Sequence, residues 1–291
     1  MQDLRGKTAF ITGGASGIGL AMAEAFGREG MNVMLADIEA GALSKAVDEL
    51  RAKQVRAEGV VADASNRDSI RAAALQTLAK FGKVHVVCNN AGVATGGLFG
   101  TVPEKDWDWI LDVNLKGVVY GMEVFEPLIA SHGEGGHFVN TASMAGMVSP
   151  PTMEPYCATK FAVVAMSEGW AGQLAAKNIG VSILCPGFVQ TRIHESRRNR
   201  PESYGADQRE VRSEAELVSA AAVQGGIPVG PVAQRVVEAI HDNDLYVFTH
   251  PEMKAAVEMR FQRILEAFDK SAKSPVISAL PAREPPALLD N

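Results

Sequence analysis

TGGASGIG, at residues 12–19, stands between a short apolar run at 7–12 (KTAFIT) and an amphipathic segment at 17–30. Glycines permit a tight turn and a close approach of the backbone to a ligand, and the first N–H groups of a following helix can bind a phosphate. The spacing from Gly13, G-x-x-x-G-x-G, differs from the more common G-x-G-x-x-G. With a strand before it and a helix after it, the loop predicts a β–α–β unit that binds a phosphate-bearing cofactor.

Short apolar runs and longer amphipathic segments alternate along most of the chain. The expected strands are at 7–12, 32–37, 56–62, 84–89, 136–141, 179–185 and 245–249. The expected helices are at 17–30, 39–53, 66–81, 104–131, 155–177 and 231–243. Most strand segments are rich in Val, Ile and Phe without alternation, which is typical of strands covered on both faces. The pattern therefore predicts an α/β fold, a doubly wound parallel sheet of Rossmann type, in a single domain over residues 1–250.

Residues 188–230 depart from this alternation, because they separate the sixth expected strand from the next clear helix by far more than a usual connection. The segment leaves the carboxyl end of a strand, where open α/β sheets bind their ligands. We therefore interpret it as a substrate lid that includes a short helix, SEAELVSAAAV at 213–223. The alternative interpretation is a surface insertion with no role in binding.

Residues 251–291 follow the last expected strand and are predicted to form a C-terminal helix and a tail. The segment 251–270 places apolar side chains along one helical stripe. This stripe comprises Val257, Phe261, Ile264, Leu265 and Phe268. We expect the helix to pack on the domain or on a second subunit, and the proline-containing residues 274–291 to form a loose tail.

The composition is that of an ordinary globular protein, with 47% hydrophobic and 21% charged residues in 291. The formal charge is −6 and the only basic block is RRNR at 197–200, which argues against nucleic acid or an anionic membrane as a partner. The first residues lack the pattern of a signal peptide, and no apolar stretch approaches the roughly 18 residues that span a bilayer. The three cysteines are far apart, so we expect reduced thiols in a cytoplasmic protein.

Asp37 closes the second expected strand, 18 residues after Gly19. A carboxylate there can accept hydrogen bonds from the ribose hydroxyls of adenosine and would repel a 2′-phosphate. No Lys or Arg occurs at 13–19, and Asp37 is followed by Ile38. These residues favour NAD over NADP as the cofactor. The alternative for Asp37 is a solvated turn residue at the end of a strand.

Tyr156 and Lys160 lie four residues apart in PYCATK, so they share one face of the predicted helix. A free tyrosine ionises near pH 10. A fixed positive charge beside it favours the phenolate, so we expect Lys160 to lower the pKa of Tyr156 toward the useful range. An isolated Tyr-x-x-x-Lys is more often a packed aromatic and a solvated lysine. With the glycine loop and Ser143 thirteen residues upstream, we interpret the pair as an acid–base centre.

Seven motifs occur in an order and spacing that resemble those of the short-chain dehydrogenases/reductases. They are TGGASGIG, Asp63 after the third expected strand, NNAG at 89–92, Asn114 in VNLKG, Ser143 in NTASMAG, YCATK and CPG at 185–187. The resemblance extends over residues 5–250. It implies a Rossmann-type domain with the catalytic residues Asn114, Ser143, Tyr156 and Lys160. It also implies a homodimer or homotetramer that forms through the helices at 104–131 and 155–177.

The resemblance further assigns a role to each site residue. Tyr156 transfers the proton, Ser143 holds the substrate oxygen, and Asn114 keeps a proton-carrying water chain in place. The implied cofactor contacts are Gly13, Ser16, Gly17, Ile18, Gly19, Asp37, Asp63, Ala64, Asn90, Ala91, Gly92, Tyr156, Lys160, Pro186, Gly187, Val189 and Thr191. Two of these have alternatives from the residues alone: Asp63 can cap the following helix, and Asn90 can be a turn residue.

The substrate pocket is expected to be lined by Met144, Val148, Met153 and Phe188, which are apolar and favour a hydrophobic or aromatic secondary alcohol or its ketone. RRNRPESYG, HDNDLYVFTHPE and FQRILEAF also resemble segments of bacterial dehydrogenases that oxidise the benzylic alcohol of lignin-derived aryl ethers. Two other classes remain open, a nucleotide-binding regulator without turnover and a nucleotide-sugar epimerase or dehydratase. No metal site is predicted. We expect His85 to be a packed core residue and His194 to lie at the surface of the lid.

Overall fold

The sheet of the computed structural model has seven parallel strands in the order β3-β2-β1-β4-β5-β6-β7. The strands are β1 Thr8–Thr12, β2 Asn32–Asp37, β3 Ala57–Val61, β4 Val86–Asn89, β5 Gly136–Thr141, β6 Ile179–Cys185 and β7 Tyr246–Phe248. The structure describes residues 1–205 and 214–281. Every residue of β1 and of β5 is buried, as the apolar runs without alternation predict. The predicted doubly wound parallel sheet is confirmed.

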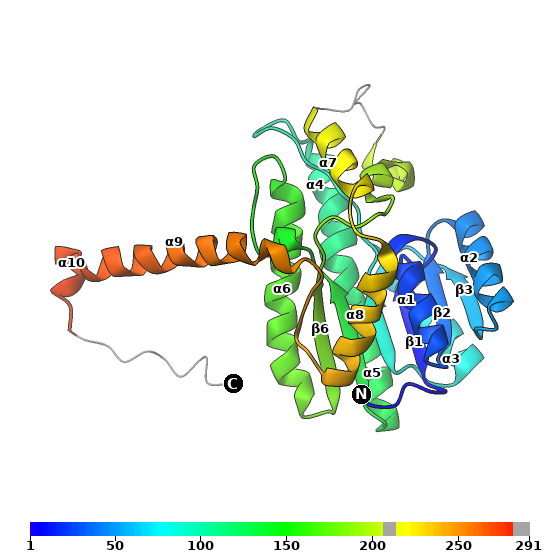
Figure 1. The fold of residues 1–291 in the computed structure, drawn as a ribbon. Coiled ribbons are helices and arrows are strands. Elements are labelled where there is room, and N and C mark those ends of the chain that lie inside the picture. The colour runs from blue at the N-terminus through cyan, green and yellow to red at the C-terminus, as the bar shows by residue number, and fades with distance from the viewer. Residues whose placement is uncertain (206–213, 282–291) are drawn as a thin grey trace. The chain divides into compact units, whose positions relative to one another are not determined.

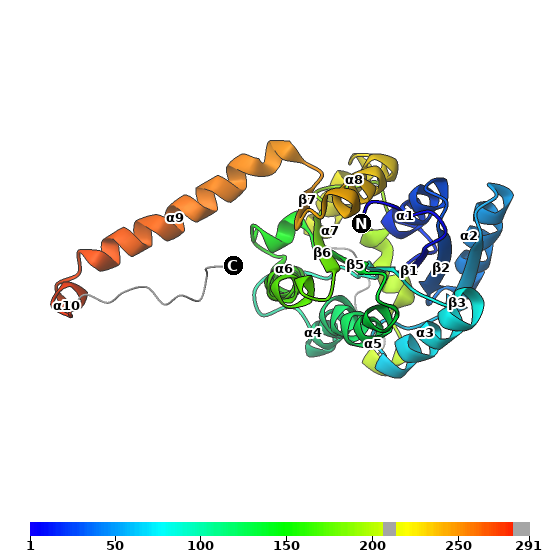
Figure 2. The same ribbon diagram turned by 90° about the horizontal axis from the view of Figure 1, so that it is seen from below.

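Helices cover both faces of this sheet. Figure 2 shows α1 (Gly17–Arg28), α2 (Ala40–Ala52) and α8 (Val229–Asp242) on one face, and α3 (Arg67–Phe81), α4 (Glu104–Leu111), α5 (Gly117–His132) and α6 (Glu154–Ala175) on the other. Each helix turns an apolar stripe inward: in α8, Val232, Val236 and Ile240 follow one another at intervals of four residues and are all fully buried.

The order of the strands reverses between β1 and β4. From β1 the chain adds β2 and β3 on one side, and then continues from β4 to β7 on the other side (Figure 1). The connections that leave the carboxyl ends of β1 and β4 therefore diverge to opposite sides. Such a switch point leaves a crevice at the carboxyl edge, where doubly wound sheets bind their ligands.

The region 104–131, predicted as one helix, contains an interruption. A π-helical turn at Asp112–Lys116 separates α4 from α5. The extra residue in this turn cannot be read from apolar periodicity, because it depends on a contact of Asn114 with a distant segment.

The segment predicted as a lid, 188–230, consists mainly of short helical elements in its described part. It forms 3₁₀ turns at Ile193–Asn199 and Glu202–Tyr204, and then α7 at Glu214–Gln224. A parallel bridge between Val189 and Ile227 joins its two ends. Residues 206–213, including the first residue of the expected short helix, lie outside the described residues.

The chain divides into two compact units, Met1–Thr249 and His250–Asn291. The second unit contains α9 at Lys254–Ala272, which agrees with the predicted helix, and a short α10 at Pro275–Ser278. The prediction of a loose tail is therefore wrong for residues 275–278, where Pro275 occupies the first helical position that favours it. Residues 282–291 of that tail lie outside the described residues. Within the described ranges, none of the helices has the length and apolar character needed to cross a bilayer.

Candidate active site

The glycine loop is tightly folded against its own helix. Gly13 and Gly17 have φ of +62° and +57°, a region that residues with a side chain rarely adopt. A Cβ atom at Gly19 would stand 2.2 Å from the carbonyl oxygen of Gly13. The three glycines therefore allow the chain to turn directly from β1 into α1 and leave the N-terminus of α1 close to the crevice.

Thr12 and Asn90 connect the glycine loop to the loop after β4. The Thr12 hydroxyl accepts hydrogen bonds from the backbone N–H groups of Asn90 and Ala91, at 2.9 and 3.0 Å. The Asn90 side chain donates to the carbonyl oxygen of Thr12 at 3.0 Å. Sequence reasoning missed Thr12 as a site residue, although a buried hydroxyl at the end of an apolar strand is a usable signal.

Asp37 lies at the carboxyl end of β2 and faces the glycine loop. Its two carboxylate oxygens accept hydrogen bonds from the backbone N–H groups of Ala15 and Glu39, each at 3.0 Å. These bonds fix the carboxylate, and a carboxylate has further lone pairs for ribose hydroxyls. The alternative of a merely solvated turn residue does not fit this fixed position.

Asp63 follows β3 and is also fixed locally. Its Oδ1 accepts from the backbone N–H and the hydroxyl of Ser65, at 2.8 and 2.6 Å. The N-cap of α3 is Asn66, whose side chain accepts from the N–H of Ser69. The alternative role for Asp63 as the helix cap is therefore wrong.

Tyr156 and Ser143 meet above β5 and β6. The phenol of Tyr156 is hydrogen-bonded to the Ser143 hydroxyl, and its burial raises the pKa of Tyr156 to about 12. The Ser143 oxygen also accepts from the N–H of Ala145 at 3.1 Å and donates to the carbonyl oxygen of Pro186 at 3.3 Å. Ser143 is thus held in place from two sides with its oxygen against the phenol.

Lys160 lies beneath Tyr156 and is only 3% exposed. Its Nζ donates to the carbonyl oxygen of Thr141 at 2.8 Å and stands 5.5 Å from the centre of the Tyr156 ring. Burial lowers the pKa of Lys160 to about 8. In the chain on its own, burial of the phenol holds the pKa of Tyr156 above its usual value; a lowering by Lys160 in a complex with the oxidised cofactor stays a prediction.

Asn114 is fully buried inside the π-helical turn. Its amide oxygen accepts from the N–H of Val93 at 2.8 Å, and its amide nitrogen donates to the carbonyl oxygen of Val93 at 2.9 Å. A Cβ atom at Gly92 would lie 3.5 Å from Asn114 Oδ1 and 3.7 Å from Lys160 Nζ. The structure therefore brings the four predicted catalytic residues together at the end of β4 and β5.

The predicted cofactor residues all lie at the carboxyl edge of the sheet. They follow β1 (Gly13, Ser16, Gly17, Ile18, Gly19), β2 (Asp37), β3 (Asp63, Ala64), β4 (Asn90, Ala91, Gly92) and β6 (Pro186, Gly187, Val189, Thr191), with Tyr156 and Lys160 from α6. Thr191 reaches the glycine loop, since a Cβ at Gly17 would lie 3.2 Å from its methyl group.

The four residues predicted to line the substrate pocket differ in exposure. Met144 is buried at 3%, Val148 and Met153 are half-buried, and Phe188 is 46% exposed. Met144 follows Ser143 directly, and Met153 is the N-cap residue of α6, three residues before Tyr156.

The described part of the lid is fixed to α4 by ion pairs. Asp106, only 2% exposed, accepts a hydrogen bond from Arg197 at 2.9 Å and pairs with Arg200. The Tyr204 hydroxyl donates to Asp112 at 2.8 Å. The side chain of His194 is only 9% exposed, so its predicted surface position is wrong.

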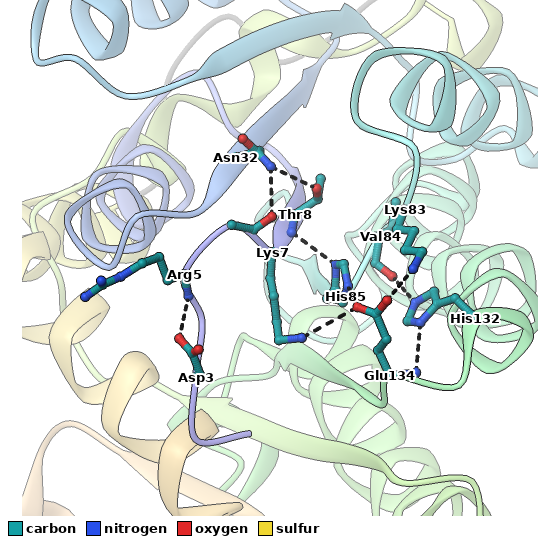
Figure 3. A network of polar contacts seen from close by, with 11 residues as sticks. Asp3, Arg5, Lys7, Thr8, Asn32, Lys83, Val84, His85, His132 and Glu134 are labelled. Carbon is teal, nitrogen blue, oxygen red and sulfur yellow. Dashed lines mark hydrogen bonds and ion pairs between the residues drawn. The ribbon is translucent and has the colours of Figure 1, made fainter.

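A histidine cluster lies at the opposite, amino edge of the sheet (Figure 3). Ligand atoms of His85, His132 and Glu134 lie within 4.8 Å of one another. However, His85 Nδ1 accepts from the N–H of Thr8, and both nitrogens of His132 are hydrogen-bonded to backbone groups. Glu134 pairs with Lys7 and Lys83, whose charges would repel a cation. We therefore describe the cluster as a polar network, in which His85 is buried as expected.

Comparisons with known proteins agree with this geometry. Residues 7–202 match the family model described as short chain dehydrogenase. The chain is 35% identical over 272 residues to a CLA biosynthesis dehydrogenase/reductase of Lactiplantibacillus plantarum, covering 91% of this chain and 95% of the relative. It is 35% identical over 269 residues to the C alpha-dehydrogenase of Sphingobium sp., covering 92% and 88%. A short chain dehydrogenase/reductase of Burkholderia phymatum, solved in complex with NAD, has a TM-score of 0.89 at 39% identity and covers 98% of this chain and 100% of that one.

Proposed function

The chain belongs to the short chain dehydrogenases, and on that premise we propose that it is an NAD-dependent enzyme that interconverts an aromatic secondary alcohol and its ketone. The observation that carries the proposal is the contact of Tyr156 with Ser143, with Lys160 beneath the phenol ring. Two neutral hydroxyls that share one hydrogen bond can both reach a single substrate oxygen.

The residues at the carboxyl edge fit a dinucleotide. The glycine loop leaves no room for side chains at Gly13 and Gly19, and it presents the backbone N–H groups of the first turn of α1. Asp37 is fixed where it can accept hydrogen bonds from ribose hydroxyls, and its negative charge favours NAD over NADP. When bound there, NAD supplies the hydride acceptor.

Tyr156 exchanges the proton of the substrate oxygen. In the chain itself its pKa of about 12 keeps it a phenol, which can donate its proton to a ketone oxygen. Alcohol oxidation needs Tyr156 as the phenolate, which receives the hydroxyl proton while the substrate carbon passes its hydride to the bound dinucleotide. Ser143 holds the substrate oxygen at the phenol, and Lys160 places its positive charge 5.5 Å from the centre of the phenol ring.

An aromatic substrate is supported by two observations. Val148, Met153 and Phe188 are apolar and partly exposed, and the buried Met144 directly follows Ser143. The relative from Sphingobium is named a C alpha-dehydrogenase, which agrees with the likeness seen in the sequence. We further propose that the enzyme works as a homo-oligomer in the cytoplasm, and sedimentation of a single 30.9 kDa species at micromolar concentration would contradict the assembly.

The test is the Tyr156→Phe variant, which removes only the hydroxyl. NADH formation from a panel of aryl and alkyl secondary alcohols is measured for both proteins, together with NAD affinity by calorimetry. We expect the best wild-type substrate to be aryl, and the variant to lose about 10²–10⁴-fold in turnover, the usual contribution of an acid–base group. NAD affinity should fall far less than turnover, because Tyr156 is only one of many predicted cofactor contacts. Undiminished turnover in Tyr156→Phe would reject the assigned chemistry, and a wild-type protein that binds NAD but oxidises no alcohol would favour the regulator.

A further inference from the structure

Glu39 is the point at which the lid segment meets the loop after β2. Its Oε1 accepts hydrogen bonds from Arg198 Nε at 3.1 Å, from Arg198 Nη2 at 2.8 Å and from Asn199 Nδ2 at 2.8 Å. The side chains of Glu39 and Arg198 are 27% and 25% exposed, so solvent screens this pair only in part. Arg198 also donates to the carbonyl oxygen of Arg192, which holds the guanidinium in place.

This contact lies next to Asp37, the carboxylate to which the proposed function assigns the adenosine ribose. The backbone N–H of Glu39 donates to Asp37 Oδ1, and Asp37 Oδ2 reaches the glycine loop at Ala15. A guanidinium that is 159 residues away in the sequence is therefore brought to the loop that directly follows Asp37, where the proposed function places the adenosine ribose. Guanidinium groups bind phosphate oxygens in a bidentate manner, so an arginine at this position is chemically suited to a 2′-phosphate.

Glu39 occupies the same donors that a phosphate would use. Arg198 directs both Nε and Nη2, the two donors of one bidentate fork, at a single oxygen of Glu39. Burial acts to raise the pKa of Glu39, but the hydrogen bonds from Asn199 and Arg198 and the positive charges of Arg198 and Arg192 together hold that pKa below its usual range, so the carboxylate stays ionised. A 2′-phosphate entering this corner has to displace a charged competitor from the guanidinium.

We propose that Glu39 is a second determinant of the cofactor preference, and that it excludes NADP by holding Arg198 rather than only by repelling the phosphate. This inference rests on the proposed function, because it assumes that the dinucleotide binds at the carboxyl edge with its adenosine at Asp37. The proposal gives the lid segment a part in cofactor selection through Arg198. No motif of the glycine loop or of β2 predicts a role for this residue.

A double-mutant cycle between Glu39→Gln and Arg198→Gln tests the proposal. The affinities for NAD and for NADP are measured by calorimetry on the full chain, with unfolding midpoints to verify folding. In Glu39→Gln we expect NADP affinity to rise about tenfold, because the Arg198 guanidinium is no longer held by a carboxylate and can bind the 2′-phosphate instead. NAD affinity should change less than about threefold. In the Arg198→Gln background the same Glu39→Gln change should alter NADP affinity less than about threefold.

Simple repulsion predicts something different. If Glu39 acts only through its negative charge, NADP affinity rises equally with and without Arg198, and the proposal is overturned. The matched control is Glu126→Gln, because Glu126 accepts from Lys177 at 2.7 Å and is 24% exposed, much like Glu39, but lies on α5. An equal gain in Glu126→Gln would mean a general charge effect and would also reject the proposal. A wild-type protein that binds neither dinucleotide would instead contradict the proposed function itself.

Discussion

Lys160 is a charged side chain held almost entirely out of water. Its one hydrogen bond within the described structure goes to the carbonyl oxygen of Thr141. A buried ammonium loses its hydration, and this loss lowers the pKa of Lys160 to about 8. The folded state therefore carries a cost for a charge that the proposed chemistry requires beneath Tyr156.

Lys160→Met should raise stability while it abolishes turnover. The folded-state pKa of about 8 is below the usual 10.5, so the folded protein binds fewer protons than the unfolded chain between these values. The buried ammonium therefore destabilises the folded state fully below pH 8, and this destabilisation disappears as the pH rises to about 10.5. At pH 7 we expect the free energy of unfolding to rise by about 1–3 kcal/mol, measured by urea denaturation. A variant that is less stable than the wild type at pH 7 would contradict this account.

At the scale of elements, a buried histidine joins β5 to β6. His137 Nε2 lies 2.8 Å from the Ser182 hydroxyl, which itself donates to the carbonyl oxygen of Asp244, so Ser182 accepts from His137. His137 Nδ1 is buried without a hydrogen-bond partner among the described residues. Protonation there would bury an unsatisfied N–H, and burial lowers the pKa of His137 to about 3.

The stability of the β5–β6 pair should therefore fall in acid. The unfolded histidine titrates near pH 6.5 while the folded one stays neutral, so the unfolded state binds the extra proton as the pH drops below 6.5. At pH 5 this contributes a loss of about 2 kcal/mol relative to pH 8. His137→Gln keeps an N–H donor for Ser182 without titrating, so its stability should vary less between pH 8 and pH 5. An unchanged pH slope in the variant, measured by urea denaturation, would show that His137 is not responsible.

A second element-scale prediction concerns the attachment of the lid to α4. Asp106 is nearly inaccessible and faces two arginines, and the Arg200 guanidinium also lies 5.6 Å from the centre of the Trp109 ring. Asp106→Asn would leave the buried Arg200 and the partly buried Arg197 without their carboxylate; breaking a buried ion pair typically costs about 3–5 kcal/mol. We expect the lid to detach locally before the domain unfolds. Hydrogen exchange should show faster exchange at 193–204 and unchanged protection in β4 and β5; uniform loss of protection would argue against a local role.

Much of this architecture can be predicted from local sequence patterns, but the long-range contacts that hold the site residues in place cannot. The seven strands and the Tyr156–Lys160 face were predictable because each depends on neighbours within one or two turns. The π-helical turn depends on the bond between Asn114 and Val93, 21 residues apart, and the position of Glu39 depends on Arg198, 159 residues away. The pKa of Tyr156 likewise depends on the burial that the whole fold imposes. Such contacts leave no periodic signal in the sequence.

For the whole molecule, the two edges of the sheet have separate tasks. The carboxyl edge holds the residues to which we assign catalysis and cofactor binding, whereas the amino edge holds the network of Lys7, Lys83, His85 and Glu134. That network ties the start of β1 to the segments that precede β4 and β5 (Figure 3). Since no residue of the network belongs to the site, its removal should change stability without changing cofactor binding.

Glu134→Gln tests this separation. The charges and hydrogen bonds of Lys83 and His85 lower the pKa of Glu134 to about 2, so its stabilising contribution is present above pH 4.5 and is lost as the pH falls from about 4.5 to 2. At pH 7 we expect the variant to unfold a few degrees lower than the wild type, and at pH 3 the difference should shrink. NAD affinity at pH 7 should be the same in both proteins, because the substitution lies at the edge opposite Asp37 and Tyr156. A matching loss of NAD affinity would mean that the amino edge also shapes the site, and a difference in unfolding temperature that grows in acid would reject the ion pairs as its cause.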